Sequence, residues 1–162
     1  MTHGIGDYLL PRLDVVCAVL LGSAVFMLAP LSAISSSLNI EGVWVNGDAD
    51  GWIELGITNG ELRGRIIGSP GDPENQKPSR NDAENPDAKL RHRPLRGLFI
   101  LYGFRSDGDG HWTGGRVYDP NSGHTYRGTI TQLDADTLKL RGYVGITWFG
   151  RTETWKRRPD SL

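Results

Sequence analysis

Cysteine is almost absent from this chain of 162 residues. The only one, Cys17, lies inside an apolar run near the N-terminus, so no thiol is left in the rest of the sequence. This shortage excludes a disulfide framework, the usual support of small secreted folds, and it excludes a thiol nucleophile. A domain of about 129 residues after the apolar run can bury an adequate core without disulfides.

Long apolar runs are also scarce, and only residues 15–31, VVCAVLLGSAVFMLAPL, are uncharged over such a length. The run is short for a membrane span and leads into small residues, LSAISSS, as in a secretory signal peptide. We therefore expect residues 1–33 to be a signal peptide, cleaved after Ala33 or Ser35. The segment before the run lacks the usual basic excess. An uncleaved membrane anchor and a start codon placed too far upstream therefore stay open as alternatives.

Neither sign of charge is in excess. The charged residues of segment 1–33 are Arg12, Asp7 and Asp14, and the whole chain has 18 basic and 19 acidic residues. Removal of that segment leaves equal numbers of both signs. Because proteins that bind nucleic acid usually carry a basic excess, we expect no nucleic-acid partner.

Helical spacing is missing as well, since no stretch after the leader keeps it over several turns. Short runs instead alternate apolar and polar residues between Gly, Asn, Asp and Pro, which indicates antiparallel strands. The expected strands are residues 42–46, 52–58, 61–67, 98–104, 111–119, 124–132, 137–144 and 147–156. The short connections between most of them predict an up-and-down meander, and about eight strands avoid exposed edges most simply by closing. The predicted fold is therefore all-β, a single antiparallel barrel within residues 34–162.

The clearest turn is Asn59-Gly60, because both residues tolerate the positive φ angles of a type I′ turn. This turn sets a register that places Glu54 opposite Arg65, and we interpret them as an outward structural pair. The apolar residues of the hairpin then share the other face: Ile53, Leu55, Ile57, Leu62 and Ile66.

Several motifs occur in order along the chain. They are GVW at 42–44, DAENPD at 82–87, RPLRG at 93–97, WTGGRVYDPNSGHTY at 112–126, LKLRGYVG at 138–145 and GRTETW at 150–155. Together they resemble the bacterial DUF2147 family over nearly all of the chain after the leader. The resemblance implies an exported protein, periplasmic or secreted, with a lipocalin-like β-barrel. It implies no activity, because that family has none assigned. A retained leader would instead anchor the protein to the inner membrane through residues 15–31.

The motif Gly42-x-Trp44 on the first expected strand is also similar to the Gly-x-Trp and arginine pair of lipocalins. In those barrels the arginine covers the tryptophan and helps to close one end. Arg151 or Arg157 of the last strand could play that part here, and the sequence does not choose between them. We expect Trp44 to be buried near a barrel end beneath one of these arginines.

Arginines and aromatic residues occupy strand positions where a simple core would have aliphatic side chains. Either they face solvent, or some of them point inward and form a lumen with polar groups. Buried charge needs partners, and Glu153, Asp119 and Asp87 are available. Such a lumen suits a small ligand with an apolar body and an anionic or carbonyl group. The candidate ligand-binding residues are Trp44, Tyr118, Tyr126, Arg141, Tyr143, Arg151 and Trp155.

The connection 68–94 is polar and too long for an ordinary loop. Side chains at its centre can bond backbone groups and so hold the loop together. We hypothesise in addition that one of its aspartates reaches Arg141 or Arg151 and holds the loop across a barrel mouth as a lid. The candidate lid residues are Asp82, Asn85 and Asp87.

Signals for a metal or for catalysis are weak. The histidines of the domain, His92, His111 and His124, are widely separated and lack ligand spacing. The stretch 81–87 lacks the glycine and the terminal glutamate of an EF-hand loop. There is no Gly-x-Ser-x-Gly motif, and a pair such as Asp82 and His124 could be assembled by folding in almost any chain. We expect no metal and no cofactor.

The sequence leaves three candidate functions open, and each of them predicts a different interior of the barrel. An open cavity lined by arginine and tyrosine favours a barrel that binds a small amphipathic ligand. Packed aliphatic layers favour a closed structural or interaction module. A carboxylate within hydrogen-bond reach of His124 or His92 inside a cavity favours a hydrolase that uses loop carboxylates.

Overall fold

The computed structural model describes residues 38–72, 75–145 and 150–159. The expected signal peptide, residues 1–33, lies outside these ranges, and its cleavage stays a prediction. Within the described ranges no helix is long and apolar enough to cross a membrane.

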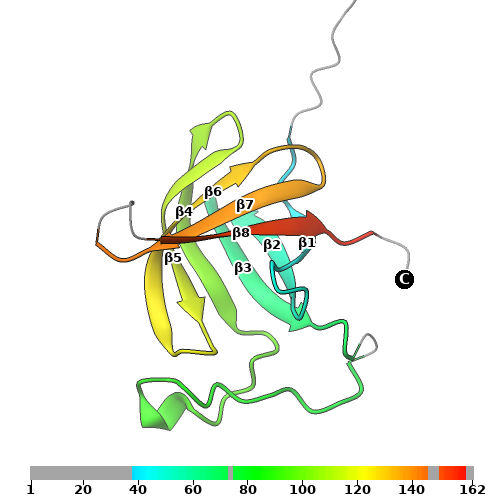
Figure 1. Ribbon diagram of the computed structural model, residues 1–162, viewed down its shortest axis with the longest axis vertical. Helices are drawn as coiled ribbons and strands as arrows, with labels where there is room; N and C mark the ends of the chain where they lie inside the picture. The colour runs from blue at the N-terminus through cyan, green and yellow to red at the C-terminus, as the bar shows by residue number, and fades with distance from the viewer. Residues whose placement is uncertain (1–37, 73–74, 146–149, 160–162) are drawn as a thin grey trace, which may run out of the picture. The chain divides into compact units, whose positions relative to one another are not determined.

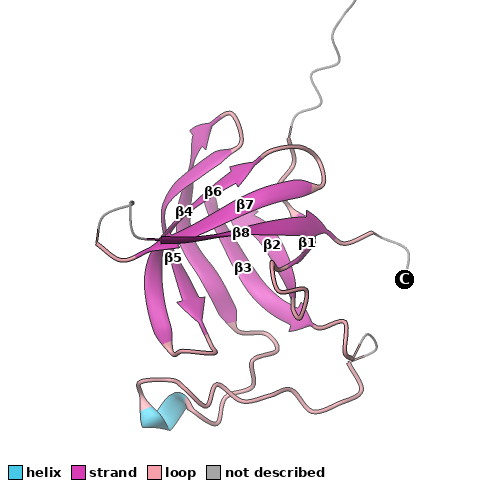
Figure 2. Cartoon of the chain, viewed as in Figure 1, coloured by secondary structure: helices cyan, strands magenta, loops and turns pink. Residues whose placement is uncertain are grey.

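The described chain forms a closed antiparallel barrel in which each strand pairs with the next and the last pairs with the first. Figures 1 and 2 show the strands wrapped around one interior, with a long loop between the third and fourth. The strands are β1 (Gly42–Val45), β2 (Trp52–Thr58), β3 (Glu61–Gly68), β4 (Phe99–Gly108), β5 (His111–Asp119), β6 (His124–Gln132), β7 (Thr137–Tyr143) and β8 (Gly150–Arg157). The long loop carries a 3-10 turn, η1 (Ala88–Leu90). The prediction of an all-β up-and-down barrel is confirmed.

The β2–β3 hairpin has the predicted register. Asn59 and Gly60 have φ angles of 52° and 72°, as a type I′ turn requires. Glu54 lies opposite Arg65, and their side chains form an exposed ion pair with 2.6 Å between Arg65 Nη2 and Glu54 Oε2. The inward face is confirmed for Ile53, Leu55 and Leu62, which are buried, whereas Ile57 at the end of β2 is exposed.

One end of the barrel is filled by side chains. At its centre lies Phe104 of β4, whose ring occupies the space that side chains at Gly115 and Gly128 would need. A Cβ atom at Gly128 would lie 2.9 Å from Phe104 Cζ, and one at Gly115 would overlap the ring itself. Other buried apolar residues of this half are Ile40, Trp44, Leu55, Leu62, Leu101, Trp112, Ile130 and Leu138. This end is therefore a solid core.

The same end is closed by Trp44 and Arg157, which lie opposite each other on β1 and β8. Trp44 is fully buried, and the Arg157 Cζ atom lies 4.3 Å from the centroid of its ring. The Trp44 indole donates a hydrogen bond of 2.9 Å to the Ile40 carbonyl. The prediction of a buried Trp44 is confirmed, and Arg157 rather than Arg151 covers it.

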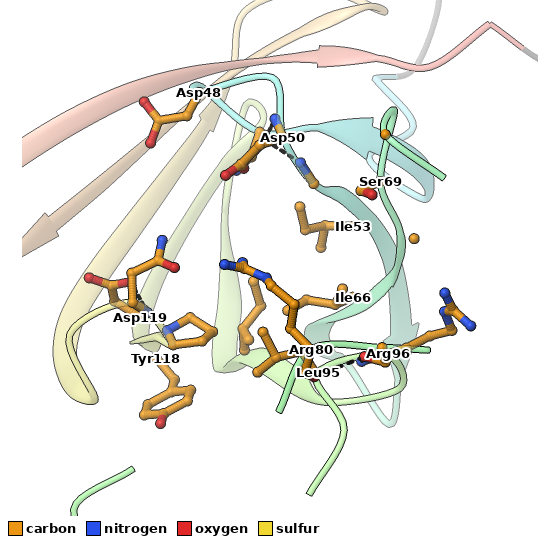
Figure 3. Close-up of a pocket in the computed structure, with 18 of the residues that line it drawn as sticks. Asp48, Asp50, Ile53, Ile66, Ser69, Arg80, Leu95, Arg96, Tyr118 and Asp119 are labelled. Carbon is orange, nitrogen blue, oxygen red and sulfur yellow. Dashed lines mark hydrogen bonds between the residues drawn. The ribbon is translucent and has the colours of Figure 1, made fainter. Parts of the chain in front are cut away.

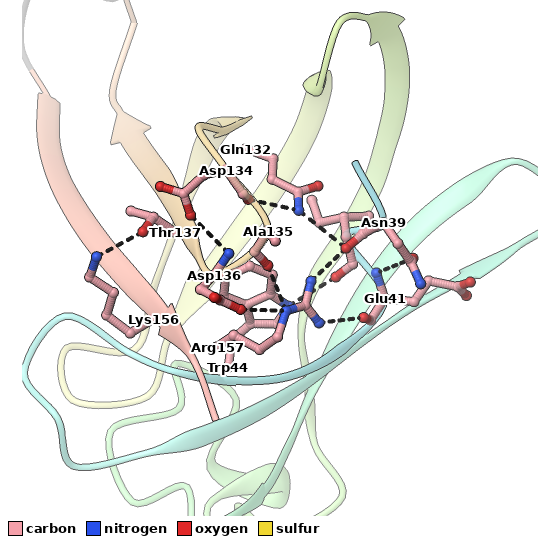
Figure 4. A network of polar contacts seen from close by, with 11 residues as sticks. Asn39, Glu41, Trp44, Gln132, Asp134, Ala135, Asp136, Thr137, Lys156 and Arg157 are labelled. Atoms are coloured by element: carbon pink, nitrogen blue, oxygen red, sulfur yellow. Dashed lines mark hydrogen bonds and ion pairs between the residues drawn. The ribbon is translucent and has the colours of Figure 1, made fainter. Parts of the chain in front are cut away.

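Arg157 also joins three segments of the chain, as Figure 4 shows. Its guanidinium donates hydrogen bonds to the carbonyl oxygens of Asn39, Glu41 and Ala135. Gly42 leaves the room for it, since a Cβ atom there would lie 2.7 Å from Arg157 Nη1. The Gly-x-Trp motif thus supplies both the ring and the space that the arginine needs.

Candidate functional site

The opposite end of the barrel is open and contains a cavity of about 460 Å³. Because the chain runs up and down, β1, β3, β5 and β7 end at this end of the barrel, and β2, β4, β6 and β8 begin there. Figure 3 shows the cavity between strands of the barrel and the segment that carries Arg80. Its volume lies within the range of about 300–1,000 Å³ that is usual for small-molecule sites.

The floor of the cavity is apolar and comes from six strands. Its side chains stand above the filled half, and they are Ile53, Ile66, Ile100, Val117, Leu140 and Trp155. Trp155 of β8 pairs with Leu138 of β7, which belongs to the core, so the floor continues directly into the packed interior. An apolar group that enters the cavity meets hydrocarbon on several sides.

A second lobe of about 250 Å³ adjoins the first. Both lobes are bordered by Val117, Asp119, Leu140, Arg151 and Glu153, so they share one wall. The second lobe adds Tyr126 of β6 and Tyr143 of β7 to the lining. The open half of the barrel thus offers a branched space with an apolar floor.

A chain of polar contacts crosses one wall. Arg151 Nη2 lies 3.0 Å from Asp48 Oδ1, and Arg151 Nε lies 3.5 Å from Glu153 Oε1. The Trp155 indole donates a hydrogen bond of 3.1 Å to the other oxygen of Glu153. Arg151 and Asp48 are 70% and 56% exposed, so their ion pair contributes at most about 1 kcal/mol. The expected lumen carboxylate Glu153 does face the arginine of its own strand.

The long loop forms the facing wall with residues 77–80, Leu95 and Arg96. Arg96 Nη2 lies 3.3 Å from Asp72 Oδ2, and the same guanidinium donates to the carbonyl oxygens of Asn75 and Lys77. Arg96 therefore holds the first part of the loop against the start of β4.

The centre of the loop is fixed by a buried polar cluster around Asp82. Its carboxylate accepts hydrogen bonds from the Tyr118 hydroxyl at 2.6 Å and from Asn85 Nδ2 at 2.7 Å. It also accepts from Arg93 Nε at 2.8 Å and pairs with Arg93 Nη2 at 2.8 Å. Asp82 is fully buried and Asn85 is nearly so. The loop is therefore attached to β5 through the Tyr118 hydroxyl.

The same contacts shift two pKa values. Burial alone would raise the pKa of Asp82, but the hydrogen bonds from Tyr118, Asn85 and Arg93 together with the Arg93 charge lower it below its usual value. Burial raises the pKa of Tyr118, and its hydrogen bond to the Asp82 carboxylate raises it further. The cluster thus keeps Asp82 charged and Tyr118 neutral near pH 7.

The hypothesis that Asp82 or Asp87 reaches Arg141 or Arg151 is wrong. Asp82 binds Arg93 of its own loop, because only 11 residues separate them and the backbone between them folds back. Asp87 accepts a hydrogen bond from the Lys89 backbone amide at the start of η1. Arg141 donates to Thr152 Oγ1 on the outer face of β7 and β8.

The family whose description reads "Uncharacterized protein conserved in bacteria (DUF2147)" matches residues 42–157. The chain belongs to the DUF2147 family. The match covers all the strands of the barrel and confirms the resemblance seen in the sequence motifs. A search of the curated proteins found no match.

The DUF2147 barrel is also similar to a solved structure, that of protein HP1028 from the human pathogen Helicobacter pylori, which is described as belonging to the lipocalin family. The TM-score is 0.69 at 24% sequence identity, and the alignment covers 76% of this chain and 86% of that chain. This likeness shows the fold alone, and it confirms a lipocalin-like barrel.

The DUF2147 barrel brings most of the candidate ligand-binding residues to the two lobes. Those that line them are Tyr118, Tyr126, Tyr143, Arg151 and Trp155. Trp44 does not, because it is fully buried beneath Arg157 at the closed end. Arg141 does not, because its position on β7 alternates with Leu140, whose side chain forms part of the floor. Ligand contact by the five lining residues stays a prediction.

Sequence reasoning missed Arg80 in the wall. It lies in a polar loop with no strand alternation, so no local signal marks it as facing a cavity. Only the path of the loop beside Leu95 brings it there, through a hydrogen bond of 2.8 Å from the Leu95 amide to the Arg80 carbonyl.

The described part of the DUF2147 barrel contains neither a histidine–carboxylate pair nor a metal-binding cluster of the kinds considered from the sequence. In those residues no hydrogen bond joins His92 or His124 to a carboxylate, and the ring of His124 lies 6.3 Å from that of Tyr126. The His111 ring contacts Thr131 at 3.4 Å. No group of three histidine, cysteine or acidic side chains gathers there in a way that could hold a metal ion.

Proposed function

We propose that this protein is an exported bacterial barrel that binds a small amphipathic ligand in the open half of its lumen. The observation that carries the proposal is the cavity of about 460 Å³, with an apolar floor and a polar mouth. Sites for small molecules usually combine a mostly apolar lining with a few polar groups that fix orientation. The lipocalin-like fold is consistent with this use, since barrels of this size hold one small ligand.

Export is a separate part of the proposal. It rests on the apolar run 15–31, the small residues after it and the lack of cysteine in residues 34–162. The alternative is an anchor in the inner membrane formed by the same run.

A closed structural or interaction module is the second candidate, because one half of the barrel is filled. The packing of Phe104 against Gly115 and Gly128 would serve such a module equally well. The two candidates differ in whether the open half holds a molecule in the cell.

Native mass spectrometry of the protein purified from its own host tests this difference. We expect a population heavier than the polypeptide by the mass of one small molecule. Ile66→Trp should remove this population, because Ile66 is half-buried on the cavity floor and the larger ring would fill the space. The matched control is Ile57→Trp on the same hairpin, where the side chain is 39% exposed at the closed end. Bare polypeptide in the parent, or an adduct that survives Ile66→Trp, contradicts ligand binding in this cavity.

A further inference from the structure

Among the described residues, Arg80 is the cation of the cavity lining for which no side-chain partner is found. It is an exposed residue of the β3–β4 loop, and its guanidinium lines the cavity. Figure 3 shows this side chain extending over the floor, with Tyr118 and Asp119 on one side and Ile53 and Ile66 on the other. A guanidinium has five N–H donors. Within the described part of the chain, the Arg80 side chain makes no hydrogen bond and no ion pair.

The other cations of the lining are already engaged. Arg151 is held by Asp48 and Glu153, and Arg96 by Asp72 and two carbonyl oxygens. Lys77 Nζ donates to the Gly71 carbonyl at 3.0 Å. A ligand that bound one of these cations would have to share it with the protein groups already in contact, whereas Arg80 has all its donors available.

The acids of the lining are satisfied too. Asp48, Asp72 and Glu153 face arginines. Asp50 accepts from Asn46 Nδ2 at 2.7 Å. Asp119 accepts from the amide of Asn121 and the hydroxyl of Ser122 in its own turn. Among the described residues, every carboxylate of the lining therefore accepts at least one hydrogen bond, whereas the Arg80 guanidinium makes none, and this difference favours an anionic ligand over a cationic one.

We infer that the ligand is an acidic amphiphile whose carboxylate or phosphate is bound by Arg80 while its apolar body covers the floor of Ile53, Ile66 and Trp155. The inference rests on the proposed function and adds the sign of the ligand's charge and the residue that recognises it. Guanidinium binds carboxylate and phosphate through paired hydrogen bonds, so both head groups fit the same side chain.

The test measures binding of four probes with the same alkyl chain to the protein purified from cells that make the full chain. The probes are decanoate, decyl phosphate, decanol and decyltrimethylammonium, each below its micelle concentration. Tryptophan fluorescence reports binding, because Trp155 lies on the floor. We expect the Kd of at least one acidic probe to be about ten-fold or more below that of decanol. A ratio of this size corresponds to the free energy that one hydrogen bond to a charged group contributes to binding. The ranking of decanoate against decyl phosphate distinguishes the two head groups.

Variants assign the effect to Arg80. Arg80→Gln should abolish the preference for acidic probes, and Arg80→Lys should keep part of it. Arg127→Gln is the matched control, since Arg127 is an exposed arginine on the outer face of β6 that does not border the cavity. Equal melting temperatures of the variants show that folding is unchanged.

The outcomes separate this inference from the proposed function. Equal affinities for decanol and both acids, tightest binding of the ammonium probe, or an unchanged preference in Arg80→Gln overturn the acidic ligand while amphiphile binding stands. If none of the four probes binds, the acidic ligand and the amphiphile site both fail.

Discussion

At the residue scale, Trp44 determines how the filled end of the barrel is closed. Its ring is fully buried between the core and Arg157, so Trp44→Ala leaves a cavity that a rigid barrel fills poorly. We expect this variant to lower the free energy of unfolding by about 3–5 kcal/mol, measured by urea denaturation. Phe99→Ala is the control, because Phe99 is 43% exposed and its loss should have a much smaller effect. An unchanged midpoint in Trp44→Ala would show that the ring does not support the closure.

Asp82 makes stability depend on pH. Its pKa is lower in the folded protein than in the unfolded chain, so the folded state binds fewer protons in that range. The stabilisation that the Asp82 carboxylate contributes is complete above the ordinary aspartate pKa of about 4, and it is lost as pH falls through the lowered pKa of Asp82. Urea unfolding at a series of pH values from about 6 downward measures how steeply the free energy of unfolding falls with pH, which we call the acid slope.

Asp82→Asn should lower stability near neutral pH by about 1.5–3 kcal/mol, as for a hydrogen bond to a charged group, and should flatten the acid slope. Asp87→Asn is the matched control in the same loop, since Asp87 accepts a single amide hydrogen bond at an exposed 3-10 turn. The same slope in Asp82→Asn and the parent would mean that other carboxylates carry the acid sensitivity.

At the element scale, the β5–β6 turn and the long loop fit together at Gly123. Gly123 has a φ angle of 70°, and a Cβ atom there would overlap the Glu84 carbonyl oxygen. We expect Gly123→Ala to push the loop off the turn and to speed hydrogen exchange of the amides at Asp82 and Asn85. In the parent protein, the Asp82 amide donates a hydrogen bond to the Arg93 carbonyl, and the Asn85 amide donates one to the Asp82 carbonyl.

Gly97→Ala is the matched control for this experiment. Gly97 also has a positive φ angle, 89°, but a Cβ atom there would meet nothing within 4 Å. Both variants therefore strain the backbone, and only one creates a steric clash. Equal exchange rates in the two variants would show that docking on the turn does not protect the loop.

Strand positions followed from the sequence because alternation is a local pattern. The Asn59-Gly60 turn fixed the β2–β3 register and so placed Glu54 against Arg65. The end of β4 was predicted too early, at residue 104. Arg105 and Ser106 continue to pair with Thr113 and Trp112, since exposed ends of hairpins accept polar residues. The predicted start of β8 at residue 147 falls outside the described residues.

The cavity could be predicted only in part. Arg151, Glu153 and Trp155 follow the alternation of one strand, so the sequence predicted that they share a face but left open whether that face points inward. The partners of Asp82 were not predicted, because the sequence pointed to Arg141 and Arg151 of the strands, whereas only the path of the loop brings Asp82 to Arg93 and Tyr118. Choice among such partners depends on tertiary distances that no local pattern encodes.

At the scale of the whole molecule, the sequence predicts that the protein is exported and loses its leader. The apolar run 15–31 and the cleavage sites after Ala33 or Ser35 predict a mature protein that begins near residue 34. N-terminal sequencing of protein made in its host, with separation of soluble and membrane fractions, checks this. An intact leader in the membrane fraction would establish an anchor in place of a signal peptide.

The seam between β1 and β8 has a consequence for the time at which the barrel closes. Arg157 Nη1 binds the Glu41 carbonyl across 116 residues of sequence, and β1 gains its second neighbour only from β8. A ribosome adds about 5–20 residues per second, so roughly 6–23 s pass between the synthesis of these two positions. Until β8 is complete, β1 has one unpaired edge that can join another chain. The newly made protein is thus most prone to aggregate before its last strand is complete.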